Sequence, residues 1–136
     1  MPGSGVRLIV VDAANVIGSR PDGWWRDRSG AARRLLMAVA EAWERLGRSD
    51  EVVVVLEGAA KAAIAGGVGP ELDGLRVVRA AGSGDDAIVA VVAAAVGAAE
   101  DRPITVVTAD RGLRDRVEAL GARVVGPRWL MDRIEV

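Results

Sequence analysis

Residues 6–18, VRLIVVDAANVIG, decide the fold. The run opens with an almost uninterrupted series of apolar, mostly β-branched residues, which is typical of a strand buried on both faces of a parallel sheet. Asp12 ends the run, and a short helical pattern follows it. A buried strand that passes directly into a helix predicts a β-α unit, and therefore an α/β protein.

Further runs of the same kind occur along the chain. In addition to the strand at 6–12, we predict strands at 51–57, 75–80, 104–110 and 122–126. Because helical patterns separate them, we expect a three-layer α/β sandwich with a mainly parallel five-stranded sheet in the order 3-2-1-4-5 and right-handed crossovers.

The helical patterns differ in their polarity. Residues 30–47 are amphipathic, and their apolar face carries Leu35, Leu36, Val39, Trp43 and Leu46. The segment after Asp86 is apolar all round, which predicts a helix sandwiched between the sheet and other elements. Shorter patterns at 111–120 and 128–134 complete the alternation.

Composition limits the chemistry. The chain of 136 residues suits a single domain over 1–136, and its formal net charge of -1 argues against a protein that coats nucleic acid through bulk electrostatics. It has no cysteine and no histidine, which excludes disulfides, zinc fingers and catalytic arrangements built on those side chains. It has no apolar stretch of bilayer length and no signal-peptide layout, so we expect a cytoplasmic protein without a membrane partner. Any catalysis must use carboxylates.

Acidic residues follow the predicted strands. They end the first, second and fourth strands and open the helix after the third: Asp12, Glu57, Asp110, and the pair Asp85 and Asp86. In a parallel sheet these junctions share one edge, and the expected order places the first and fourth strands side by side at a crevice. Clustered carboxylates repel one another unless a cation neutralises them, and oxygen-only ligands suit Mg2+ or Mn2+. We therefore predict a divalent-metal site at this edge.

Each acid also has a structural alternative. Ser83 is a residue type favoured at the N-cap of a helix. Asp86 stands at the capping-box position, where its side chain would reach back to the backbone amide of the N-cap residue. In the structural alternative, Asp110 does no more than cap the next helix, and Asp12 does no more than shape a turn. The coincidence of acids at separate β-α junctions of one edge favours the metal site over these alternatives.

Three motifs carry a resemblance to a known family. VDAANVIG (11–18), GSGDDAIVA (82–90) and VVTADRGLRDRV (106–117), in this order, resemble the NYN branch of the PIN-like nuclease superfamily over nearly the whole chain. The resemblance implies metal-dependent cleavage of RNA phosphodiester bonds by an acidic cluster that binds Mg2+ or Mn2+. The chain departs from the family at Glu57, where aspartate is common.

Residue by residue, the resemblance implies a set of ligands and catalytic groups. The metal ligands would be Asp12, Asp85, Asp86 and Asp110, with Asn15 as a catalytic companion and Asp115 as a candidate outer acid. Asn15 would orient a phosphate or a metal-bound water, or would only cap its helix. A metal at such a site lowers the pKa of a bound water and neutralises charge on the phosphate, so no protein nucleophile is needed.

The loop GSRPDGWWRDRSG (18–30) leaves the same edge. It combines adjacent tryptophans with arginines, which suit base stacking and phosphate contacts. Alternatively, one tryptophan closes over the core while the arginines pair with Asp22 and Asp27. The predicted substrate-binding residues are Trp24, Trp25, Arg26, Ser83 and Arg111, whereas Trp43 and Trp129 are expected in the core.

The leading hypothesis is a metal-dependent endoribonuclease that acts on single-stranded or loop regions of RNA. A metal-dependent nucleotide phosphohydrolase would use the same acids and would employ the tryptophan loop as a base clamp. A catalytically inactive PIN-like module that binds RNA or protein is the third class. A homodimer is compatible with each of them.

Overall fold

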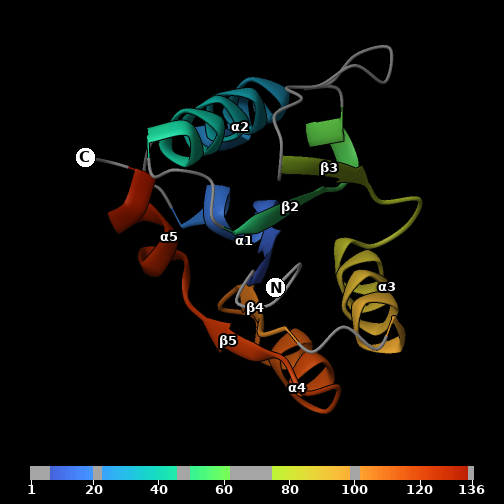
Figure 1. Ribbon diagram of the computed structural model, residues 1–136. Coiled ribbons are helices and arrows are strands. Elements are labelled where there is room, and N and C mark those ends of the chain that lie inside the picture. The colour runs from blue at the N-terminus through green and yellow to red at the C-terminus, as the bar shows by residue number, and fades with distance from the viewer. Residues whose placement is uncertain (1–6, 20–22, 46–49, 62–74, 99–101, 135–136) are drawn as a thin grey trace.

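The computed structural model describes residues 7–19, 23–45, 50–61, 75–98 and 102–134 (Figure 1). Its strands are β1 (Leu8–Asp12), β2 (Glu51–Leu56), β3 (Leu75–Arg79), β4 (Ile104–Val107) and β5 (Arg123–Val125). Every neighbouring pair is parallel, and the order is β3-β2-β1-β4-β5. The predicted sheet order is confirmed.

Helices cover both faces of this sheet. The helical elements are α1 (Ala13–Gly18), the 3-10 turn η1 (Trp24–Arg26), α2 (Arg28–Arg45), α3 (Gly84–Gly97), α4 (Arg111–Glu118) and α5 (Pro127–Ile134). In Figure 1, α2 and α5 lie on one side of the sheet and α3 and α4 lie on the other. The predicted three-layer sandwich is therefore confirmed.

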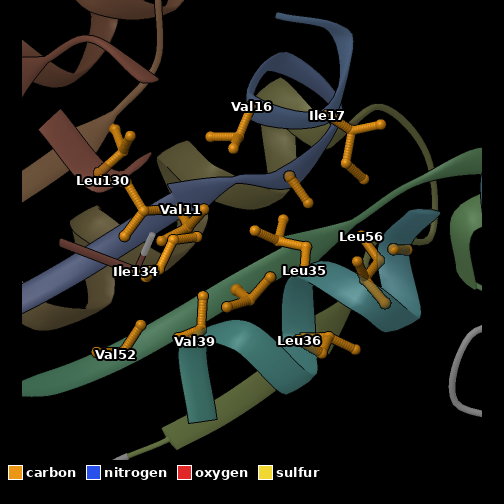
Figure 2. Close-up of a cluster of buried hydrophobic side chains, with 14 of the residues drawn as sticks. Val11, Val16, Ile17, Leu35, Leu36, Val39, Val52, Leu56, Leu130 and Ile134 are labelled. Carbon is orange, nitrogen blue, oxygen red and sulfur yellow. The ribbon is translucent and has the colours of Figure 1, made fainter. Parts of the chain in front are cut away.

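Alternate residues of β1 enter different cores. Ile9 and Val11 pack toward α2 and α5, where Figure 2 shows Leu35, Leu36 and Val39 of α2 beside Leu130 and Ile134 of α5. Leu8 and Val10 pack on the other face with α3 and α4. Because both faces are buried, every position of this strand had to be apolar until Asp12.

The main difference in strand bounds concerns β4. We predicted a strand at 104–110, but β4 ends at Val107, and Thr108 to Asp110 form the turn into α4. The Asp110 side chain accepts a hydrogen bond from the Leu113 backbone amide, so this residue caps α4 instead of extending the sheet. The other strands begin and end within two residues of their predicted bounds.

The prediction that α3 is sandwiched was wrong for the described residues. Only Gly84, Ile88 and Val92 of this helix are buried, and Val96 is 46% exposed. Three of the six exposed positions are alanine, whose small side chain exposes little apolar area to water. An all-apolar helix made of small residues can therefore lie at the surface.

The amphipathic helix behaves as predicted. It begins at Arg28, two residues before the predicted start at residue 30, and it buries Leu35, Leu36, Val39 and Trp43. Leu46 lies outside the described residues.

Trp43 and Trp129 differ in burial. Trp43 is buried, and its ring nitrogen donates to the Asp50 carbonyl oxygen at 3.1 Å. Trp129 is only half-buried, which corrects the expectation of a core position. Its ring stacks with the guanidinium groups of Arg133 and Arg7, which lie 3.8 and 5.3 Å from the ring centre.

Candidate active site

Asp12 is a buried carboxylate at the end of the central strand. It is 5% exposed, and its Oδ2 accepts a hydrogen bond of 2.8 Å from the Thr108 hydroxyl. Its Oδ1 accepts a bond of 3.3 Å from the Asn15 backbone amide, which caps α1. Both oxygens are thereby oriented, one by the following helix and the other by the neighbouring β4 junction.

One more hydrogen bond joins the β1 and β4 junctions, and another stabilises the β4 junction itself. The Asn15 side-chain oxygen accepts from the Ala109 backbone amide at 2.8 Å, and the Thr108 hydroxyl accepts from the Asp110 backbone amide at 3.1 Å. Asn15 thus holds the turn after β4, a role that differs from both predicted ones. Thr108 was missed as a functional residue, although a threonine two positions before Asp110 in the sequence TAD could have indicated it.

Asp110 caps α4 and keeps its charge at the edge of the sheet, while its role as a metal ligand stays a prediction. Its Oδ1 accepts from the Leu113 backbone amide at 3.0 Å, so the predicted helix cap is present. The side chain is nevertheless exposed and acts electrostatically on Asp85 across the edge. Capping therefore leaves the charge of Asp110 facing the same edge as Asp85.

The start of α3 is capped by two side chains. Ser83 accepts from the Asp86 backbone amide at 3.1 Å, as predicted. The reciprocal capping-box bond from Asp86 is not formed among the described residues, because the Asp86 carboxylate pairs with Arg116 of α4 at 3.0 Å. Instead, the Glu57 carboxylate accepts from the Gly84 backbone amide at 2.8 Å.

The electrostatics connect four of these acids. Burial raises the pKa of Asp12, and the charges of Asp85 and Glu57 raise it further, against hydrogen bonds from Thr108 and Asn15 that lower it. Burial also raises the pKa of Asp85, with the charges of Asp110 and Glu57 next and Arg116 opposing them. The structure thus brings Asp12, Glu57, Asp85 and Asp110 to one edge. The charge of Asp86 also raises the pKa of Asp85, but the Asp86 side chain is 73% exposed and pairs with Arg116.

These acids do not form a closed metal cage. Within the described ranges, no three acidic side chains are gathered closely enough to hold a cation by themselves. Mg2+ usually keeps several waters and is bound through one or two carboxylates together with substrate phosphates. The donors present, all carboxylate and amide oxygens, fit such an open site.

The tryptophan loop is partly described. Trp25 is 57% exposed, and the Arg26 guanidinium lies 5.9 Å from the centre of its ring. Asp27 caps α2, since its side chain accepts a hydrogen bond from the Gly30 backbone amide at 3.0 Å. The Trp24 side chain, with Arg20 and Asp22, lies outside the described residues.

The remaining candidates lie on α4. Arg111 opens this helix and is exposed, and Asp115 is exposed as well. Arg114 pairs with Glu118 within the helix, and Arg116 pairs with Asp86, so both arginines lie on the exposed face of α4. The substrate role of Arg111 and the outer-acid role of Asp115 stay predictions.

Comparison with known proteins supports the fold. No family model and no curated protein matches the chain. The structure is similar to the crystal structure of Rae1 (YacP) from Bacillus subtilis, with a TM-score of 0.73 and 20% sequence identity, over 96% of this chain and 76% of that chain. This similarity supports the α/β sandwich fold, and membership of the PIN-like superfamily and of its NYN branch stays a prediction. No helix in the described part of the chain is long and apolar enough to cross a bilayer.

Proposed function

We propose that this protein is a metal-dependent endoribonuclease that hydrolyses RNA phosphodiester bonds at the edge formed by Asp12, Asp85 and Asp110. The observation that carries the proposal is the buried Asp12 carboxylate, fixed through both oxygens beside the charges of Asp85 and Glu57. A protein that only needed a helix cap at this position would gain nothing from several carboxylates that raise one another's pKa. Such a cluster is typical of a site that a divalent cation neutralises.

Each residue has a distinct part in the proposal. Asp12 and Asp85 would hold the cation, with Asp110 as the third acid and Asp86 as an outer one. A bound Mg2+ or Mn2+ would activate a water and neutralise charge on the phosphate. Asn15, oriented by Ala109, would direct its side-chain nitrogen toward a phosphate oxygen. Trp25 would offer a stacking surface to an unpaired base, which favours single-stranded RNA as the substrate.

The test is cleavage of a single-stranded RNA labelled at either end, with Mn2+, Mg2+ or EDTA. We expect internal cuts that require the metal, and a loss of at least about a hundredfold in rate for Asp12→Asn, more than the removal of an outer-shell partner usually costs. The matched control is Glu118→Gln, which removes one charge from the exposed face of α4. Equal rates for Asp12→Asn and the wild type would exclude Asp12 from the chemistry. Hydrolysis of a nucleotide panel without RNA cleavage would indicate a phosphohydrolase, and RNA binding without any hydrolysis would indicate an inactive module.

A further inference from the structure

A hollow of about 810 Å3 lies between α1 and α5. Ala14, Ala109 and Met131 contribute apolar surface to its wall, and Arg128 and Asp132 contribute charges. Its volume falls within the range of about 300–1,000 Å3 that is usual for sites that take small molecules. The hollow is therefore large enough for one nucleotide.

The hollow adjoins the candidate active site through Asn15 and Ala109, which belong to both. The Asn15 side-chain oxygen is occupied by the Ala109 amide, so the side-chain nitrogen is the group that remains to donate. That nitrogen has no hydrogen-bond acceptor among the residues that the structure describes. A donor of fixed orientation thus stands where the hollow meets the acidic edge.

The charged groups of the hollow are not committed to internal partners. Arg128 and Asp132 are exposed, four residues apart on α5, and neither forms an ion pair or a side-chain hydrogen bond with any residue in the described ranges. Arg133 on the same helix is different, because it stacks on Trp129 and donates to its carbonyl oxygen. Arg128 is therefore available to an anion that enters the hollow.

A second hollow, of about 310 Å3, lies on the other side of α1. Its lining includes Arg28 but also Glu57, whose carboxylate belongs to the acidic edge. Each hollow therefore has one arginine and one acid in its wall, but only the larger one also has the Asn15 side-chain nitrogen as a donor at its border with the acidic edge. An RNA strand that crosses the acidic edge is thus better accommodated toward α5.

We propose that the hollow between α1 and α5 receives the nucleotide next to the cleaved bond, with Arg128 binding its phosphate and the Asn15 side-chain nitrogen donating to the same nucleotide. The inference rests on the proposed function, since it assumes that RNA crosses the acidic edge. The guanidinium group suits this role because its planar donors match two phosphate oxygens at once. Asp132 lies in the same wall and opposes the phosphate by like-charge repulsion.

The test is the affinity for a fluorescein-labelled 12-nucleotide single-stranded RNA, measured by anisotropy in EDTA over a range of salt concentrations. We expect Arg128→Ala to raise Kd about five- to tenfold and to reduce the slope of log Kd against log salt by about 0.7, the value for one phosphate contact on a single strand. Arg128→Lys should keep most of that slope because it keeps the charge. Asp132→Asn should lower Kd, because it removes a negative charge from the wall of the hollow. This change is opposite in sign to the one expected for Arg128→Ala.

The matched control is Arg123→Ala. Arg123 is exposed at the first residue of β5, at the end of the strands away from the acidic edge, so its loss should leave Kd and the salt slope unchanged. Thermal unfolding identifies any variant that binds poorly because it is misfolded. If Arg128→Ala is misfolded, the Kd and salt slope of Arg128→Lys and the Kd of Asp132→Asn test the proposal instead. Equal Kd values for Arg128→Ala and Arg123→Ala, or weaker binding by Asp132→Asn, would overturn the proposal. If the wild type cleaves RNA but either of these results is found, the proposed nucleotide site in the hollow is rejected and the ribonuclease proposal stands. If RNA binds through Arg128 but is not cleaved, only the ribonuclease proposal is rejected.

Discussion

Replacement of Gly84 by alanine should have opposite effects on stability in two backgrounds. The Gly84 amide donates to the Glu57 carboxylate at 2.8 Å, and this bond joins the end of β2 to the first residue of α3. A Cβ atom at Gly84 would lie 2.9 Å from the Glu57 carboxyl carbon and 3.0 and 3.2 Å from its oxygens. Because Glu57 is a flexible side chain, it would swing away, and the hydrogen bond would be lost.

The magnitudes follow from the bond and the backbone. A hydrogen bond to a charged acceptor stabilises by about 1.5–3 kcal/mol, and the partial exposure of Glu57 reduces this to about 1–2 kcal/mol. Alanine in place of glycine at a compatible backbone position stabilises by about 0.4–1 kcal/mol. We therefore expect Gly84→Ala to lower the free energy of unfolding by about 0.8 kcal/mol in the wild type, the difference between the middles of these two ranges. In the Glu57→Ala background, where no carboxylate stands in the way, it should raise it by about 0.4–1 kcal/mol.

The assay is urea unfolding, in EDTA, of the wild type, Gly84→Ala, Glu57→Ala and the double variant. Thermal unfolding checks the result, since about 1 kcal/mol corresponds to a shift in Tm of about 3–5 °C for a chain of this size. Gln in place of Glu57 provides a control, because it keeps an acceptor for the Gly84 amide but removes the charge. The reasoning is refuted if Gly84→Ala changes stability equally with and without the Glu57 side chain.

Two further predictions concern the acidic edge and the tryptophan loop. The pKa values of Asp12 and Asp85 are raised in the folded protein, so in EDTA the unfolded chain releases these two protons at lower pH than the folded chain does. The two protonated carboxyl groups therefore contribute fully to stability below about pH 4, and this contribution is lost as pH rises through the raised pKa values. Urea unfolding should show the wild type losing stability relative to Asp12→Asn as pH rises from 4, and a difference that stays constant up to pH 8 would contradict this. Trp25→Ala should weaken the binding of single-stranded RNA roughly 5- to 150-fold, the equivalent of one base stack, with Met37→Ala as a control at another exposed apolar position. Unchanged anisotropy titrations for Trp25→Ala would assign the loop a role other than RNA binding.

The sequence predicts the sheet because the sheet leaves a simple pattern. Strands buried on both faces need uninterrupted apolar runs, as in β1 and β2, and these runs can be read without any knowledge of their partners. The helix α3 left no such unambiguous pattern, because alanine is compatible with both burial and exposure. Its surface position therefore appears only when its neighbours in space are known.

The contacts that frame the site were not predictable in the same way. The Thr108 hydroxyl reaches Asp12 across 96 positions, and Glu57 reaches Gly84 across 27. No local pattern encodes such pairs, since they depend on which strands are neighbours and on how far each turn extends. The sequence placed the acids at one edge, but only the structure shows which side chains hold them.

Helix capping and cation binding, which the sequence left as competing explanations, are compatible at this edge. Asp12 caps α1 through one oxygen and is held by Thr108 through the other, while Asp110 caps α4 through one oxygen only. At α3, Ser83 and Glu57 provide the capping contacts, so the Asp85 carboxylate accepts no hydrogen bond from the described residues. Because Glu57 takes over the capping function, Asp85 keeps both oxygens available beside the acids that raise its pKa. Glu57 thus has a structural role of its own at this edge: its carboxylate reaches the start of α3 and leaves Asp85 to face the other acids.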